Sequence, residues 1–279
     1  MTNSERTFAW ATIEPVPGLR AHRFSHRAMN TIFEVIVGGQ EAQYAEQAAW
    51  AAFDELDQIE TELSRFIEGS DIWQINSLHA GESVTVGIAA FECLQLARRI
   101  CDETSGAFDV TACGANRGMD LVLIDENEFT VTVKADGVTV DLGGIGKGYA
   151  VDRMAALLAE WEIHCAIVHS GQSSVWAIGS PPETQGWVIA LGGPAAPGAL
   201  REKLVLSNRA LSGSAQTTED RHIIARNGKP VAAAVAAWAI APSAAVADAL
   251  STAFVVMSDQ QVRQYCDDHE DCDYRRQEA

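Results

Sequence analysis

The sequence has few basic residues and no long apolar run. Only 20 Lys and Arg stand against 38 Asp and Glu, which gives the 279-residue chain a formal net charge of −18. Because nucleic-acid binding depends on Lys and Arg that neutralise phosphates, this balance argues against a nucleic-acid partner. Even the alanine-rich segment 231–241 is too short to cross a bilayer, so we expect no membrane span.

Signals for export and for structural zinc are also missing. Residues 1–20 contain no apolar region behind a basic start, so we expect no signal peptide. The six cysteines are scattered and lie mostly among apolar residues, and together these features predict a cytoplasmic, reduced protein. Cys266 and Cys272 flank a charged stretch whose spacing matches no zinc pattern. We prefer a solvated terminus to a metal clip there.

The apolar pattern predicts a mixed α/β chain without an internal repeat or a clear linker. Residues 41–66 carry the best helical spacing, with apolar side chains recurring on one face. Ser70 is expected to cap a short helix that ends near Asn76. Three more helices are predicted over residues 89–103, 149–161 and 244–257. Strands are predicted at residues 31–37, 129–133, 138–140, 166–168, 175–178, 187–191, 203–206, 222–225 and 231–240.

Residues 140–152, VDLGGIGKGYAVD, place four glycines and a lysine between two aspartates. The preceding Asp136-Gly137 favours a hairpin between the two strands around it, so the glycines would lie on a strand-to-helix turn. A P-loop would need glycine at Asp141 and a hydroxyl residue at Gly148, and a Rossmann fingerprint fits only in part. Taken alone, the segment is compatible with a phosphate-binding turn or with a tight turn whose glycines allow close packing.

The last predicted helix carries Asp248 and Thr252 four residues apart, on one face of an otherwise almost wholly apolar segment. A buried carboxylate is costly without a partner. A carboxylate, a hydroxyl and a backbone carbonyl from a glycine turn are hard oxygen ligands of the kind that Mg²⁺ accepts. Alternatively, Asp248 caps a neighbouring turn and Thr252 bonds back to its own helix. The residues alone leave both interpretations open.

In chain order, these motifs resemble the ApbE family of FAD:protein FMN transferases. The glycine segment and Ala247-Asp-Ala-Leu-Ser-Thr252 are the most specific of them. The other resembling segments are 29–31, 63–66 with 70–76, 104–109, 206–210 and 222–231. The resemblance implies an α+β, or mixed α/β, flavin transferase fold with two lobes around a nucleotide site. This domain would span residues 29–260, between an N-terminal extension (1–28) and an acidic C-terminal tail (261–279).

The resemblance implies a Mg²⁺-dependent enzyme that splits FAD, transfers FMN to a Thr or Ser hydroxyl of an acceptor flavoprotein, and releases AMP. The acceptor would carry a Ser/Thr-Gly-Ala-Ser/Thr type of motif. By matching position, Asp248, Thr252 and the backbone carbonyl of Gly144 would hold the metal, so Asp248 would be catalytic. His222 would be the general base. The FAD contacts would be Met29, Phe66, Ala107, Phe108, Asp109, Asp141, Lys147, His222 and Ile223.

Elementary chemistry supports several of these roles. Mg²⁺ and Lys147 would spread the negative charge of a pyrophosphate, and an imidazole that titrates near neutrality suits a base for an alcohol. Phe66 and Phe108 could pack on flat rings, although without the resemblance we would assign either to the core.

The chain also departs from the family pattern. Asn30 stands where glycine is usual, Gly171-Gln-Ser-Ser174 replaces a Gly-Gly-Asp turn, and Ser212-Gly-Ser-Ala215 replaces Ala-Thr-Ser-Gly. The segment between Asp109 and the glycine turn is strongly shortened, which puts FAD affinity in question. Three alternatives therefore remain: a protein that binds FAD without transferring it, one that hydrolyses FAD, and a structural protein without flavin affinity.

Overall fold

A computed structural model describes residues 11–171, 173–192, 202–216, 223–224, 228, 231 and 235–278. Its centre is a seven-stranded sheet in the order β13-β12-β11-β8-β7-β3-β2, in which all neighbours are antiparallel. The strands are Ala21–Ala28 (β2), Thr31–Gly38 (β3), Ala166–Ser170 (β7), Ser174–Ile178 (β8), Arg209–Gln216 (β11), Val235–Ala241 (β12) and Asp273–Glu278 (β13).

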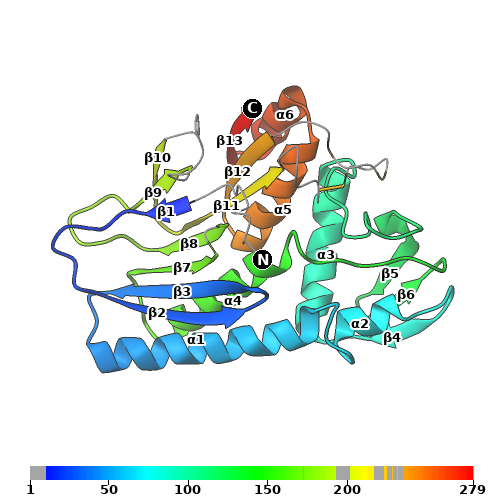
Figure 1. Cartoon of the computed structure of the whole chain (residues 1–279), viewed down its shortest axis with the longest axis horizontal. Helices are drawn as coiled ribbons and strands as arrows, with labels where there is room; N and C mark the ends of the chain where they lie inside the picture. Colours follow the sequence, from blue (N-terminus) through cyan, green and yellow to red (C-terminus); the bar gives the residue numbers. More distant parts are fainter. Residues whose placement is uncertain are drawn as a thin grey trace, which may run out of the picture.

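Both faces of this sheet are covered (Figure 1). Helices pack on one face, and a three-stranded sheet of order β1-β9-β10 packs on the other. Successive strand side chains point to opposite faces, so in β3 Val35 and Val37 join the helical core while Ile36 joins the smaller core. The helices are Ala42–Leu63 (α1), Gly146–Glu160 (α4) and Ala244–Val256 (α5), and the strands are Ala11–Ile13 (β1), Trp187–Leu191 (β9) and Lys203–Leu206 (β10).

A second lobe lies beside the sheet, at the right of Figure 1. Its sheet has the order β4-β6-β5, and it packs with two helices that follow α1 in the chain. The members of this lobe are Asp71–Asn76 (α2), Ser83–Thr85 (β4), Ile88–Glu103 (α3), the 3-10 turn Met119–Leu121 (η1), Val122–Asp125 (β5) and Thr130–Val133 (β6). The predicted mixed α/β fold is therefore confirmed.

The predicted helices are present, with shifted ends. α1 ends at Leu63 instead of Phe66, and α4 begins at Gly146, three residues before its predicted start. The Ser70 hydroxyl caps α2 as expected, because it accepts a hydrogen bond from the Trp73 N–H at 3.0 Å. Of the strand predicted at 222–225, only Ile223 and Ile224 lie within the described residues.

The hairpin predicted around Asp136-Gly137 is wrong. β6 pairs with β4 and β5, and Val138 forms only an isolated parallel bridge to Asn116. The Asn76 side chain takes the place of a strand partner, since it bonds the Val140 N–H at 2.7 Å and the Val140 carbonyl at 2.9 Å. The glycine segment therefore follows an irregular stretch rather than a strand.

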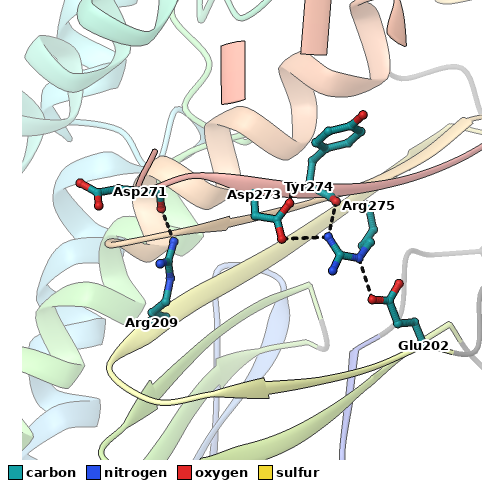
Figure 2. Close-up of polar contacts among 6 residues, drawn as sticks. All are labelled: Glu202, Arg209, Asp271, Asp273, Tyr274 and Arg275. Carbon is teal, nitrogen blue, oxygen red and sulfur yellow. Dashed lines mark hydrogen bonds and ion pairs between the residues drawn. The ribbon is translucent and has the colours of Figure 1, made fainter. Parts of the chain in front are cut away.

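The last residues of the chain are folded, although we expected a solvated terminus. Ser258 and Gln261 form a capping box that starts Asp259–Asp268 (α6), and β13 is an edge strand of the large sheet. Arg275 pairs with Glu202 at 2.7 Å and with Asp273 at 2.9 Å (Figure 2). Arginines thus offset part of the acidic charge that suggested solvation.

Candidate active site

The site is built where α4 crosses α5, and a glycine allows the crossing. A Cβ on Gly148 would overlap the carbonyl of Ala244. Asp152, one turn further along α4, accepts hydrogen bonds from the Ala244 N–H at 2.6 Å and the Ala245 N–H at 2.8 Å. Burial raises the pKa of Asp152, and these N–H donors oppose that rise. The end of the VDLGGIGKGYAVD segment therefore fixes the start of α5 against α4.

Asp248 lies in the second turn of α5 and is 3% exposed. One carboxylate oxygen accepts the Gly148 N–H at 3.1 Å, and the other accepts the Ser212 hydroxyl at 3.1 Å. The Thr252 hydroxyl donates to the Asp248 carbonyl at 3.3 Å. The capping contacts of the simpler interpretation are therefore real. A carboxylate oxygen with one donor still has a lone pair, so these contacts leave room for a cation.

The backbone at Gly144 comes close to Thr252. A Cβ on Gly144 would lie 3.2 Å from the Thr252 hydroxyl oxygen and 3.2 Å from a ring carbon of Phe108. The Ser214 hydroxyl adds a polar neighbour 3.2 Å from that of Thr252. The donor set of carboxylate, hydroxyl and carbonyl oxygens has the hardness that Mg²⁺ prefers.

One protein carboxylate in such a set would leave most of the coordination to water and ligand phosphates. Among the described residues, no three His, Cys, Asp or Glu side chains gather as an alternative metal site. The residues present therefore fit a magnesium ion whose remaining positions are filled by water or by ligand phosphates.

Two cations flank the start of α4. The Lys147 ammonium donates to the Gly143 carbonyl at 2.8 Å, and the Asp141 carboxylate accepts the Gly143 N–H at 2.9 Å. The other oxygen of Asp141 pairs with Arg65 at 3.4 Å. Arg65, which was not a predicted site residue, also lies 4.7 Å over the ring of Phe66. Its place next to Phe66 in a resembling segment was the available signal.

The two phenylalanines have different environments. Phe66 is 81% exposed, whereas Phe108 is 4% exposed within the main core. The core assignment therefore describes Phe108, and only Phe66 has an open ring face for a flat ligand. Phe108 still contributes to the site, because its ring packs beside Gly144.

Two further predicted FAD contacts, Ala107 and Asp109, lie in the loop that follows α3. The Asp109 carboxylate accepts the Thr111 N–H at 2.8 Å, and the Ala107 N–H bonds the Thr104 carbonyl at 3.1 Å. The Val110 carbonyl accepts the Asp141 N–H at 2.8 Å. This backbone bond sets the loop that contains Ala107 and Asp109 alongside the beginning of the glycine segment.

The early Met-Asn-Thr motif forms the turn between β2 and β3. Met29 and Asn30 have φ values of +48° and +59°, a conformation that asparagine tolerates better than most residues, which explains Asn30 where glycine is usual. The Met29 N–H bonds Glu60 near the end of α1, the helix that Phe66 follows. Ile223 is buried and bonds Gln216 at the end of β11, and His222 lies outside the described residues.

A surface hollow of about 490 Å³ lies elsewhere, between α3 and β5. Arg98, Arg99 and Glu126 are among its lining residues, and none of the predicted site residues is. It is therefore separate from the chemistry described above. None of the helices in the described ranges combines the length and the apolarity that a bilayer crossing needs.

Comparisons with known proteins agree with this arrangement. The sequence profile of the ApbE family matches residues 29–120 and 112–275. Flavin transferase ApbE from Vibrio cholerae superimposes with a TM-score of 0.81 at 19% identity, over 94% of this chain and 97% of that one. No curated protein matches the chain in sequence.

Two further solved structures share the architecture. For the ApbE protein of Thermotoga maritima the TM-score is 0.79 at 24% identity, over 91% and 93% of the two chains. For flavinyl transferase ApbE of Pseudomonas stutzeri, apo form, it is 0.76 at 20% identity, over 89% and 88%. At these identities the superpositions show a common fold.

Proposed function

The chain belongs to the ApbE family, and from this premise we propose that it is a Mg²⁺-dependent flavin transferase that moves FMN from FAD to an acceptor protein. The observation that carries the proposal is the meeting of Gly144, Thr252 and Asp248. The contact between Gly144 and Thr252 joins the glycine segment to α5, and the Thr252 hydroxyl bonds the Asp248 carbonyl. These are the groups that a metal bound to a diphosphate would need.

In the proposed reaction, the oxygen of an acceptor Ser or Thr hydroxyl attacks the phosphorus on the FMN side of the FAD pyrophosphate. A new phosphoester bond forms, the bond to the bridging oxygen breaks, and AMP leaves with that oxygen. When bound, Mg²⁺ would neutralise charge on the pyrophosphate. Asp248, Thr252 and the Gly144 carbonyl would hold it.

The other residues have separate roles in this proposal. Lys147 would place a positive charge beside the phosphates, in a protein whose net charge is otherwise −18. Phe66 would stack on a ring of FAD with one face, while Arg65 covers the other face of the Phe66 ring. His222 would take the proton from the acceptor hydroxyl. Met29, Ala107, Phe108, Asp109, Asp141 and Ile223 would shape the FAD site.

The partner would be a cytoplasmic flavoprotein with a Ser/Thr-Gly-Ala-Ser/Thr type of motif, as the family resemblance implies. Incubation of the protein with FAD, Mg²⁺ and a peptide that carries this acceptor motif tests the transfer of FMN. We expect AMP by chromatography and an adduct of FMN mass on the peptide. AMP without an adduct would favour FAD hydrolysis, and FAD binding without AMP would favour a binding protein.

The first prediction concerns the metal. Asp248→Ala should lower AMP release at least a hundredfold, because it removes the only carboxylate of the proposed metal set. Asp267→Ala, on the exposed surface of α6, is the matched control and should keep wild-type turnover. Turnover by Asp248→Ala at the rate of this control would refute the metal assignment.

A further inference from the structure

Two buried serine hydroxyl groups form a hydrogen-bonded chain that ends at Asp248. Ser174 on β8 and Ser212 on β11 are directly opposite each other in the sheet, and both are 0% exposed. Their hydroxyl oxygens are 3.0 Å apart, and the Ser212 hydroxyl lies 3.1 Å from the Asp248 carboxylate. The two serines therefore connect strands β8 and β11 of the large sheet to the carboxylate of α5.

Hydrogen counting gives this pair a direction. An ionised Asp248 can only accept, so Ser212 must donate its single proton to the carboxylate. Ser174 must then donate to Ser212, since Ser212 has no second proton to give. Two aligned hydroxyl dipoles thus point at the carboxylate, and in a buried environment such a chain strengthens each of its bonds.

The same contact fixes the orientation of the carboxylate. Gly148 holds one oxygen and Ser212 holds the other, so the Asp248 side chain has a donor on each side. Gly148 belongs to α4 and Ser212 to β11. The orientation of the carboxylate plane therefore depends on how this helix and the sheet pack together. Thr252 lies on α5, one turn after Asp248, and Gly144 lies on the turn before α4.

We propose that Ser212, supported by Ser174, is a positioning residue for the magnesium site at Asp248. This inference rests on the proposed function. Ser212 holds the carboxylate in the orientation that presents its remaining lone pairs toward Thr252 and Gly144. Partners that orient a metal ligand in this way typically contribute a factor of 10 to 100 in metal affinity.

The test is calorimetric titration of Mg²⁺ alone into the full chain and its variants. Ser212→Ala should bind Mg²⁺ about tenfold more weakly than the wild type. Ser174→Ala should weaken binding about threefold, since it leaves the direct contact in place. Ser180→Ala is the matched control, because it breaks another serine pair, Ser180 with Ser207 at 2.8 Å, at the far end of β8. It should bind Mg²⁺ as the wild type does.

Kinetics separate positioning from general damage. The Mg²⁺ concentration that half-saturates AMP release should rise about tenfold in Ser212→Ala, while the rate at saturating Mg²⁺ stays within about threefold of wild type. Ser212→Thr keeps the hydroxyl and should restore the affinity. A rate that falls equally at every Mg²⁺ concentration would overturn the positioning role.

The outcomes also distinguish the two proposals. If wild type and Asp248→Ala bind Mg²⁺ equally, the metal assignment in the proposed function fails. If Asp248→Ala loses Mg²⁺ but Ser212→Ala matches the wild type, only the positioning role fails. If Ser212→Ala does not fold, the Mg²⁺ affinity of Ser174→Ala tests the positioning role instead. An unchanged affinity in that variant would overturn the inference.

Discussion

Individual glycines in the VDLGGIGKGYAVD segment have different structural roles, which the residue pattern could not separate. Gly144 makes room for Thr252 and Phe108, whereas Gly148 makes room for the backbone of α5. The close-packing interpretation of the segment is confirmed, and the phosphate-binding interpretation stays a prediction. Close packing explains Gly148, and the approach of the turn to a hydroxyl of the proposed metal site explains Gly144.

The Gly148 role gives a prediction at the residue scale. Gly148→Ala should lower the free energy of unfolding by about 2–3 kcal/mol, because its Cβ would overlap the Ala244 carbonyl and push α5 away. Gly146→Ala, in the same helix, is the control. Its Cβ would have an ordinary 3.7 Å contact with Leu142, so its unfolding free energy should change by less than about 1 kcal/mol. Equal urea midpoints for the two variants would contradict the packing argument.

The sequence singled out candidate site residues that bond within their own motif, and it missed residues that come together from distant segments. Asp248 and Thr252 were identifiable because they are polar positions on an apolar helix. Ser212 was not, because only the antiparallel pairing of β11 beside β8 and the packing of α5 bring it to Asp248. Serine on a strand carries no such signal by itself.

At the scale of elements, the long helices were predictable, whereas the prediction missed short strands and also the eight-residue strands β2 and β11. α1 and α3 bury one regular face, which the apolar spacing reveals. β4 and β5 have three and four residues, so alternation leaves too little pattern to detect. The false hairpin has a related cause, since side-chain bonds from Asn76 satisfy Val140 where a ladder was expected.

A cross-strand pair gives the pH prediction at this scale. His169 on β7 lies opposite Glu34 on β3, with 2.9 Å between ring nitrogen and carboxylate. The hydrogen bond from His169 lowers the pKa of Glu34 below its ordinary value, despite partial burial. A lowered carboxyl pKa stabilises the folded state above the unfolded pKa, and the contribution is lost as pH falls through the folded pKa.

Glu34→Gln should therefore be less stable than wild type at pH 7, by about 1–2 kcal/mol. The difference should shrink as the pH falls below the ordinary pKa of a glutamate, about 4.3, and on through the lowered pKa of folded Glu34. Urea unfolding of both proteins at several pH values measures this difference in unfolding free energy. A constant difference from pH 7 to pH 3 would mean that the ion pair is not its source. Glu46→Gln, on the exposed face of α1, is the control and should show no such trend.

At the scale of the whole molecule, an early and a late segment of the chain form the two edges of the large sheet. These edge strands are β2 and β13, although the family resemblance suggested an N-terminal extension over residues 1–28 and a C-terminal tail over residues 261–279. Tyr265 of α6 also donates to Glu103 at the end of α3 at 3.0 Å, so the C-terminal segment contacts both lobes. The charge of residues 261–279 predicted solvation because pairing of Arg275 and Arg276 with distant acids is invisible in the sequence.

A chain that ends at residue 258 tests this view of the C-terminus. It would lose Val262 and Tyr265, which are 0% and 5% exposed, and would uncover Phe254. β12 would become an unpaired edge, a feature that promotes aggregation. The burial of two large side chains and a strand is worth on the order of 5 kcal/mol, which is comparable to the stability of a whole domain. We therefore expect the shortened chain to unfold without a cooperative transition by circular dichroism.

The control is full-length Asp267→Ala, which should melt as the wild type does. A sharp, wild-type-like transition in the shortened chain would instead support the original expectation that the domain ends near residue 260, with an accessory tail beyond it.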